Sequence, residues 1–140
     1  MKKTLCAAIA AASVATVPSA FATDFDVEIT NLTNGIYFTP FLAAAHPAGT
    51  TLFETGQPAS ANIQAMAEGG SIAGLEADVM GIGGTVVANP AAGLLAPATS
   101  LTFNMNTDGT SNDRLTIVAM LLPTIVAFAG LNAVEIPTEP

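Results

Sequence analysis

Basic residues are scarce in this 140-residue chain, which has three Lys and Arg against eleven Asp and Glu and a formal net charge of −8. Lys2 and Lys3 stand at the N-terminus, so Arg114 is the only fixed positive charge after them. Nucleic-acid binding depends on Lys and Arg side chains that neutralise phosphates. The composition therefore excludes a nucleic-acid partner, and the same shortage argues against binding to anionic lipid surfaces.

Cysteine and aromatic residues are also scarce. Cys6 is the only cysteine, there is no Trp, and there is one Tyr. The chain is long enough to bury a core without disulfides or a metal ion. Without aromatic rings on which a sugar could stack, a glycosidase that uses the carboxylates for acid–base chemistry is disfavoured.

The N-terminus has the pattern of a secretory signal peptide. Two lysines precede an apolar stretch of small residues at 4–17, and residues 20–22 read Ala-Phe-Ala, the sequence after which a signal peptidase cuts. The stretch is shorter than the roughly 20 residues that a transmembrane helix needs. We expect residues 1–22 to be a signal peptide and residues 23–140 to be one secreted domain, located in the periplasm, at the cell surface or in the medium.

Alternating apolar and polar residues predict a half-buried strand at 23–30, where Phe25, Val27 and Ile29 share one face. Pro40 favours an edge or bulged strand at 36–42. Ser60 is placed to cap a helix that continues through Ala67. The remaining expected elements are strands at 51–54, 85–88, 99–105, 114–122, 128–131 and 133–136, a second helix at 71–81 and a loop at 46–49.

This order of elements predicts a mainly β fold, an antiparallel β-sandwich with a short helical insertion after the third strand. The inward positions of the expected strands define the expected core. It consists of Phe25, Val27, Ile29, Phe53, Leu101, Phe103, Leu115, Ile117, Ala119 and Phe128.

Five segments, in the expected order and covering nearly all of residues 23–140, resemble the spondin N-terminal domain family in its short, secreted bacterial form. The matching segments are residues 27–33, 46–60, 65–70, 114–124 and 128–132. The resemblance implies a β-sandwich related in shape to C2 domains. It also implies an extracellular adhesion or matrix-binding module.

The resemblance further implies calcium binding, but the residues do not match that expectation. The aspartate of the family's Pro-x-x-Asp motif falls on Val126, and the segment with the other carboxylates has no counterpart after Ile136. Calcium takes 6–8 oxygen ligands. We therefore expect no metal site and no cofactor, and we expect an unpaired sheet edge where a closing strand would lie.

Asn104, Asn106 and Asp108 repeat the first half of an EF-hand calcium loop. Leu115 stands where that loop needs a bidentate Glu, and a strand precedes the motif in place of a helix. A hairpin turn capped by Asx side chains is the preferred interpretation.

The other polar and glycine-rich motifs favour structural roles. The glycines in residues 81–84 lack the long following helix that a nucleotide loop needs. His46, with Ser60 and Glu54 nearby in sequence, could form a catalytic dyad or triad, but no nucleophile elbow surrounds the serine, so hydrogen bonding of the histidine to loop backbone is preferred. Glu54 and Glu68 are interpreted as solvated surface residues.

Two functions of different classes remain open, and neither is enzymatic. The first is a non-catalytic binding or adhesion module with an unknown protein or matrix partner. The alternative is a self-associating structural subunit of a surface layer, matrix or filament, since 51% of the residues are apolar and only 10% are charged. Arg114 is expected to pair with one or more carboxylates, with ligand binding as its alternative role.

Overall fold

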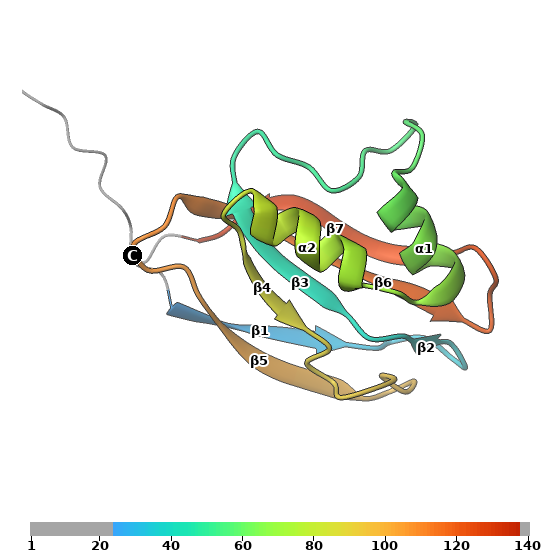
Figure 1. The fold of residues 1–140 in the computed structure, drawn as a ribbon. Helices are drawn as coiled ribbons and strands as arrows, with labels where there is room; N and C mark the ends of the chain where they lie inside the picture. Colours follow the sequence, from blue (N-terminus) through green and yellow to red (C-terminus); the bar gives the residue numbers. More distant parts are fainter. Residues whose placement is uncertain (1–23, 138–140) are drawn as a thin grey trace, which may run out of the picture.

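A computed structural model describes residues 24–137 and shows two antiparallel β-sheets and two α-helices (Figure 1). The predicted signal peptide, residues 1–22, lies outside the described residues. Within residues 24–137 no helix is both long enough and apolar enough to cross a membrane. The mainly β character predicted from the sequence is confirmed.

The larger sheet is organised around one long strand, β6 (Asn112–Leu122). The short β2 (Tyr37–Phe38) and β3 (Leu42–Pro47) follow each other along one edge of β6. β7 (Phe128–Glu135) pairs with the other edge of β6, and β4 (Thr85–Ala88) pairs with the outer edge of β3.

Pro40 interrupts the expected second strand and separates β2 from β3. The segment between the two strands, residues 39–41, remains bonded to β6. The Thr39 N–H donates to the Met120 carbonyl (3.0 Å), and the Met120 N–H donates to Thr39 Oγ1 (3.1 Å). The loop expected to begin at His46 is wrong at its start, since β3 continues through Pro47.

The smaller sheet contains β1 (Asp24–Thr30) and β5 (Ser100–Asn106), which pair along their full length. Its inner face includes Val27 and Met105, which pack in one apolar cluster with Ala43 of β3. The predicted alternation of β1 is therefore confirmed, with its apolar residues directed toward the larger sheet.

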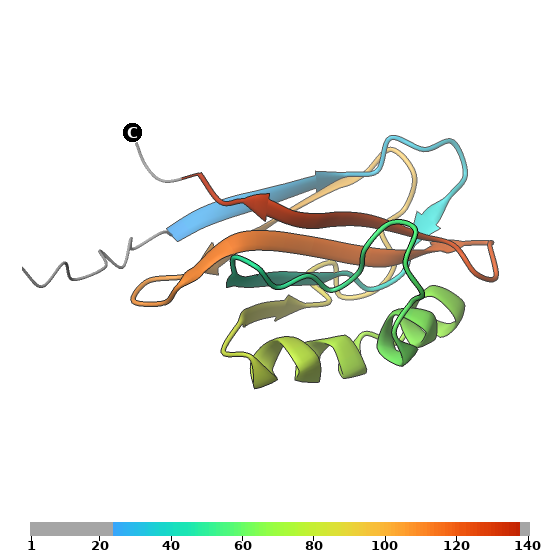
Figure 2. The same ribbon diagram turned by 90° about the horizontal axis from the view of Figure 1, so that it is seen from above.

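Two helices cover the opposite face of the larger sheet (Figure 2). They are α1 (Ala61–Gly69) and α2 (Ala73–Gly81), and in the chain they follow β3 and not the strand predicted at 51–54. Ser60 caps α1 as predicted, because its Oγ accepts a hydrogen bond from the Ile63 N–H (3.2 Å). The strand expected at 51–54 is wrong, because this segment has no regular secondary structure.

The deepest core lies on the helix side of the larger sheet. Leu42, Met66 and Val118 are fully buried there. Of the ten residues predicted to form the core, only Val27 and Ala119 are buried, and the other eight are half-buried. These eight pack against the buried clusters, and six of them do so on the face covered by the smaller sheet, which is narrow and leaves them partly accessible to solvent.

We predict that Leu42→Ala costs about 2–5 kcal/mol of unfolding free energy, since it empties a closed part of the core. Ile117→Ala should cost clearly less, because Ile117 is half-buried on the less covered face. Urea unfolding of the two variants measures the difference. Equal losses would place Ile117 in an equally closed core and contradict the described packing.

Candidate functional site

His46 is fully buried in β3, and both of its ring nitrogens have partners. Nδ1 lies 3.2 Å from the Pro47 carbonyl oxygen, and Nε2 lies 2.8 Å from Thr116 Oγ1. A carbonyl only accepts, so Nδ1 carries a hydrogen, and Nε2 shares a hydrogen bond with the Thr116 hydroxyl. The same hydroxyl oxygen accepts from the Ala133 N–H (2.9 Å). The predicted bond from His46 to backbone is confirmed.

A bulge in β7 brings Ala133 to this position. The register between β6 and β7 shifts between Leu115 and Ile117, and Ala133 has a φ of 50°. The irregular backbone leaves the Ala133 N–H without its regular ladder partner, and Thr116 supplies an acceptor. The His46 network therefore joins β3, β6 and β7 through side-chain hydrogen bonds.

The serine considered as a nucleophile does not contact His46 within residues 24–137, and the hydroxyl beside Nε2 belongs to the fully buried Thr116. Ser60 is occupied as the cap of α1, and Glu54 and Glu68 are exposed on a loop and on that helix. Glu68 accepts a hydrogen bond from Gln64 one helical turn earlier. The structure thus does not bring together His46, Ser60 and Glu54, the residues from which a triad could have been built.

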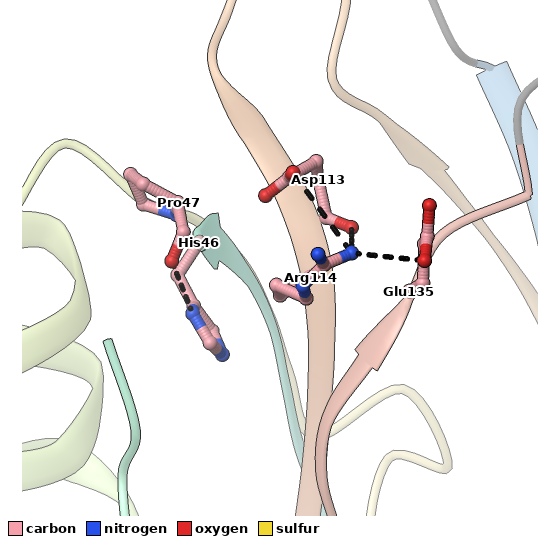
Figure 3. Close-up of polar contacts among 5 residues, drawn as sticks. All are labelled: His46, Pro47, Asp113, Arg114 and Glu135. Carbon is pink, nitrogen blue, oxygen red and sulfur yellow. Dashed lines mark hydrogen bonds and ion pairs between the residues drawn. The ribbon is translucent and has the colours of Figure 1, made fainter. Parts of the chain in front are cut away.

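Arg114 contacts two exposed carboxylates (Figure 3). Its Nη1 lies 3.6 Å from Glu135 Oε2 and 3.9 Å from Asp113 Oδ2, and it also donates to the Asp113 carbonyl (3.3 Å). The Glu135 side chain is 77% exposed. The predicted pairing is confirmed, and at this exposure it contributes about 1 kcal/mol or less to stability.

The Asn/Asp motif forms the expected hairpin turn. The Asp108 N–H donates to Asn106 Oδ1 (2.8 Å), which is an Asx turn. Asn104 is turned toward β1, where its Nδ2 donates to Asp24 Oδ1 (2.6 Å) and to Asp26 Oδ1 (3.2 Å). In the part of the chain that the structure describes, no group of three or more His, Cys, Asp and Glu side chains is placed to hold a metal ion.

Gly84, which follows α2, has a steric role. A Cβ built on Gly84 would lie 2.4 Å from Val79 Cγ1 and 2.9 Å from the Ala45 carbonyl oxygen. A larger residue would therefore push the start of β4 away from α2 and β3. This close approach explains why residue 84 is a glycine, so a nucleotide-binding role is not needed to explain it.

Two of the segments that resemble the spondin family meet on the helix side of β7. The rings of Phe53 and Phe128 pack edge to face with centroids 5.2 Å apart, and a Cβ on Gly130 would lie 2.7 Å from Phe53 Cζ. Asn132 Nδ2 donates to the Phe53 carbonyl (2.7 Å). These contacts hold the segment before α1 against β7, and no sequence pattern predicts the role of Asn132.

A cleft of about 350 Å³ opens between the two sheets, with β1 on one side and β7 on the other. β1 pairs only with β5 and β7 only with β6, so among residues 24–137 both strands have an unpaired edge here. Leu131 is 40% exposed at the rim. The cleft is lined by Glu28, Ile29, Thr30, Phe38, Phe41, Ile117, Ala129, Gly130 and Leu131.

The space between the sheets is closed at both ends of this cleft. Ile136 is buried beside the inner face of β1, and its N–H donates to the Asp113 carbonyl (2.9 Å). Beyond the other end of β1, Asn31 Nδ2 donates to the carbonyls of Ile36 (2.8 Å) and Leu95 (3.1 Å). The middle part remains open, in agreement with the expectation of an unpaired sheet edge.

Large apolar side chains are also exposed on three loops, residues 31–36, 89–99 and 123–127, that gather at one end of the molecule (Figure 1). A cavity of about 280 Å³ there is lined by Gly35, Tyr37, Leu94, Leu122 and Pro123. Val126, which stands at the position of the family's calcium-binding aspartate, is 64% exposed in the third loop. We call this surface the apolar end, defined by Leu32, Tyr37, Leu94, Ile125 and Val126.

No family model, curated protein or solved structure matches the chain. The resemblance to spondin domains stays a prediction. The cleft and the apolar end are the two candidate functional surfaces.

We predict that Thr116→Val lowers the unfolding free energy by about 1–3 kcal/mol, because it leaves His46 Nε2 and the Ala133 N–H buried without a partner. Thr102→Val on the exposed face of β5 is the matched control and should change stability by less than about 0.5 kcal/mol. Chemical denaturation measures both. Similar values for the two variants would show that the Thr116 hydroxyl contributes nothing to the buried network.

Proposed function

We propose that the protein is a secreted, non-catalytic binding module with a spondin-like β-sandwich fold, and that the cleft between β1 and β7 is its binding site. The signal-peptide pattern supports export. The packing of the smaller sheet on the larger one supports the sandwich. The observation that carries the binding role is the cleft itself, where apolar side chains and unpaired strand edges are accessible together.

The lining of the cleft supports a binding role on energetic grounds. Ile29, Ile117 and Leu131 are partly exposed in it, so a partner that covers them removes apolar surface from water. This gain is about 25 cal/mol for each Å² buried. Strand edges beside the cleft add hydrogen-bonding groups that fix the position of a bound chain.

The shape and polarity of the cleft favour a protein segment as the ligand. Its floor is formed by apolar residues of the larger sheet, and Glu28 and Thr30 are the polar residues of its lining. A small polar metabolite would find few convergent polar groups here. An extended chain with apolar side chains would match both the floor and the rim.

A pair of Leu→Gln variants tests this site. Leu131 lines the cleft and is 40% exposed, whereas Leu94 is 53% exposed at the apolar end. With the purified protein immobilised, partners captured from culture medium and cell-surface extracts should be retained by Leu94→Gln and lost with Leu131→Gln. The physical reason is that only Leu131→Gln places a polar amide in the apolar cleft.

Thermal unfolding provides the control that both variants remain folded. If folded Leu131→Gln captures the same partners as the unchanged protein, the cleft is not the binding site. Loss of capture in both variants to the same degree would likewise contradict the assignment.

The second candidate, self-association as a structural subunit, is favoured by the apolar end. Leu32 is 88% exposed and Ile125 is 80% exposed, which is unusual for side chains that remain in solvent. Size-exclusion chromatography with light scattering should then show oligomers that Leu94→Gln dissociates and Leu131→Gln does not. A stable monomer at all concentrations would rule out this candidate.

A further inference from the structure

We infer that the free edge of β1 accepts an extended segment of another protein, whose alternate side chains are basic on the outer face and apolar on the face directed into the cleft. This inference rests on the proposed function, because it names the partner class for the same cleft. It depends on three features of β1: its backbone, its inner face and its outer face.

The backbone of β1 is available on one side. All seven residues of the strand pair with β5, and no hydrogen bond joins the other edge to any of residues 24–137. In an antiparallel pair, alternate residues direct N–H and C=O groups away from the partner strand. These groups form a ready template for one more strand.

The inner face of β1 determines which side chains suit the inward-directed positions of an added strand. Neighbouring strands share faces, so every second side chain of an added strand would point to the side on which Val27 and Ile29 lie. The cleft of about 350 Å³ is on that side, with Phe41 and Ile117 in its lining. Apolar side chains at these positions would fill the space and cover the exposed part of the lining.

The outer face of β1 determines which side chains suit the outward-directed positions of an added strand. Asp24, Asp26 and Glu28 alternate along β1 and are exposed. The Asn104 amide contacts Asp24 and Asp26 from the β5 side, while Glu28 has no hydrogen-bond or ion-pair partner within residues 24–137. Lys or Arg side chains on an added strand would lie beside these carboxylates, and opposite charges on adjacent strands attract.

Charge also argues against a second copy of this chain as the occupant. Arg114 is the only Lys or Arg among residues 24–137, and it already contacts Asp113 and Glu135. A second β1 paired along this edge would bring its own acidic face beside the first, and like charges on adjacent strands repel. The formal net charge of −8 per chain adds to this repulsion.

The test uses a synthetic peptide of alternating Lys and Val, matched in length to the seven residues of β1, and isothermal titration calorimetry at low and moderate salt. We expect binding to the unchanged protein and slower amide hydrogen exchange in β1 when the peptide is bound. Binding should be about five- to tenfold weaker for Glu28→Lys and for Leu131→Gln, each of which removes one of the two recognition features.

Matched variants and peptides separate strand addition from diffuse attraction. Glu54→Lys makes the same charge change at an exposed position on the helix side, and Leu94→Gln repeats the apolar change at the apolar end, so both should bind as the unchanged protein does. A peptide N-methylated at alternate residues keeps the charge but cannot pair along the edge, and it should not bind. An alternating Glu and Val peptide should not bind either.

Several outcomes would overturn the inference. One is equal binding of the N-methylated peptide, which would indicate attraction by charge alone. Another is loss of affinity with Glu54→Lys equal to that with Glu28→Lys. Homodimers that Leu131→Gln dissociates would identify a second copy as the occupant of the cleft.

Failure of this inference can be distinguished from failure of the proposed function. If the Lys and Val peptide does not bind but capture of partners from extracts still depends on Leu131, the cleft remains a binding site. In that case only the assignment of a basic, extended segment as its ligand is wrong. If neither peptide binding nor capture depends on Leu131, both are wrong.

Discussion

The larger sheet has apolar side chains on both faces, so both faces must be covered by other elements. In this protein the two covering layers differ in width. Two helices close one face of the larger sheet, and the most deeply buried side chains, including Leu42 and Val118, lie beneath them. The other face is covered by the two strands of the smaller sheet. Because that cover is narrow, several large side chains below it, among them Phe25, Ile29 and Ile117, are only half-buried, and the space between β1 and β7 stays open.

The buried polar network determines how the open side is shaped. His46, Thr116 and the Ala133 N–H satisfy one another inside the sheet, so the bulge in β7 does not leave a buried donor unpaired. The bulge falls between the pair Leu115 and Val134 and the pair Ile117 and Leu131. On the cleft side of the bulge, regular pairing places Leu131 opposite Ile117, and both side chains reach the cleft.

Charge gives the open side its chemical character. With few charges in the whole chain, the local arrangement of carboxylates matters more than their number. Three of them alternate along the outer face of β1, next to an unpaired backbone edge and an apolar cleft. In the binding role that we propose, the carboxylates on this outer face disfavour an added strand with acidic side chains, because like charges on adjacent strands repel.

Local elements with strong periodicity or clear end signals are predictable from the residues alone. The alternation in β1, the Ser60 cap of α1, the Asx turn at Asp108 and the mainly β class could all be predicted, because each depends on neighbouring residues. The extension of β3 through His46 could not, since it depends on pairing with Arg114 and on the bond to Thr116, both of which are far away in the chain. Which face holds the deep core and where the cleft opens follow from the packing of the layers, because both depend on how much of one layer the next one covers. A residue pattern carries no information about that coverage.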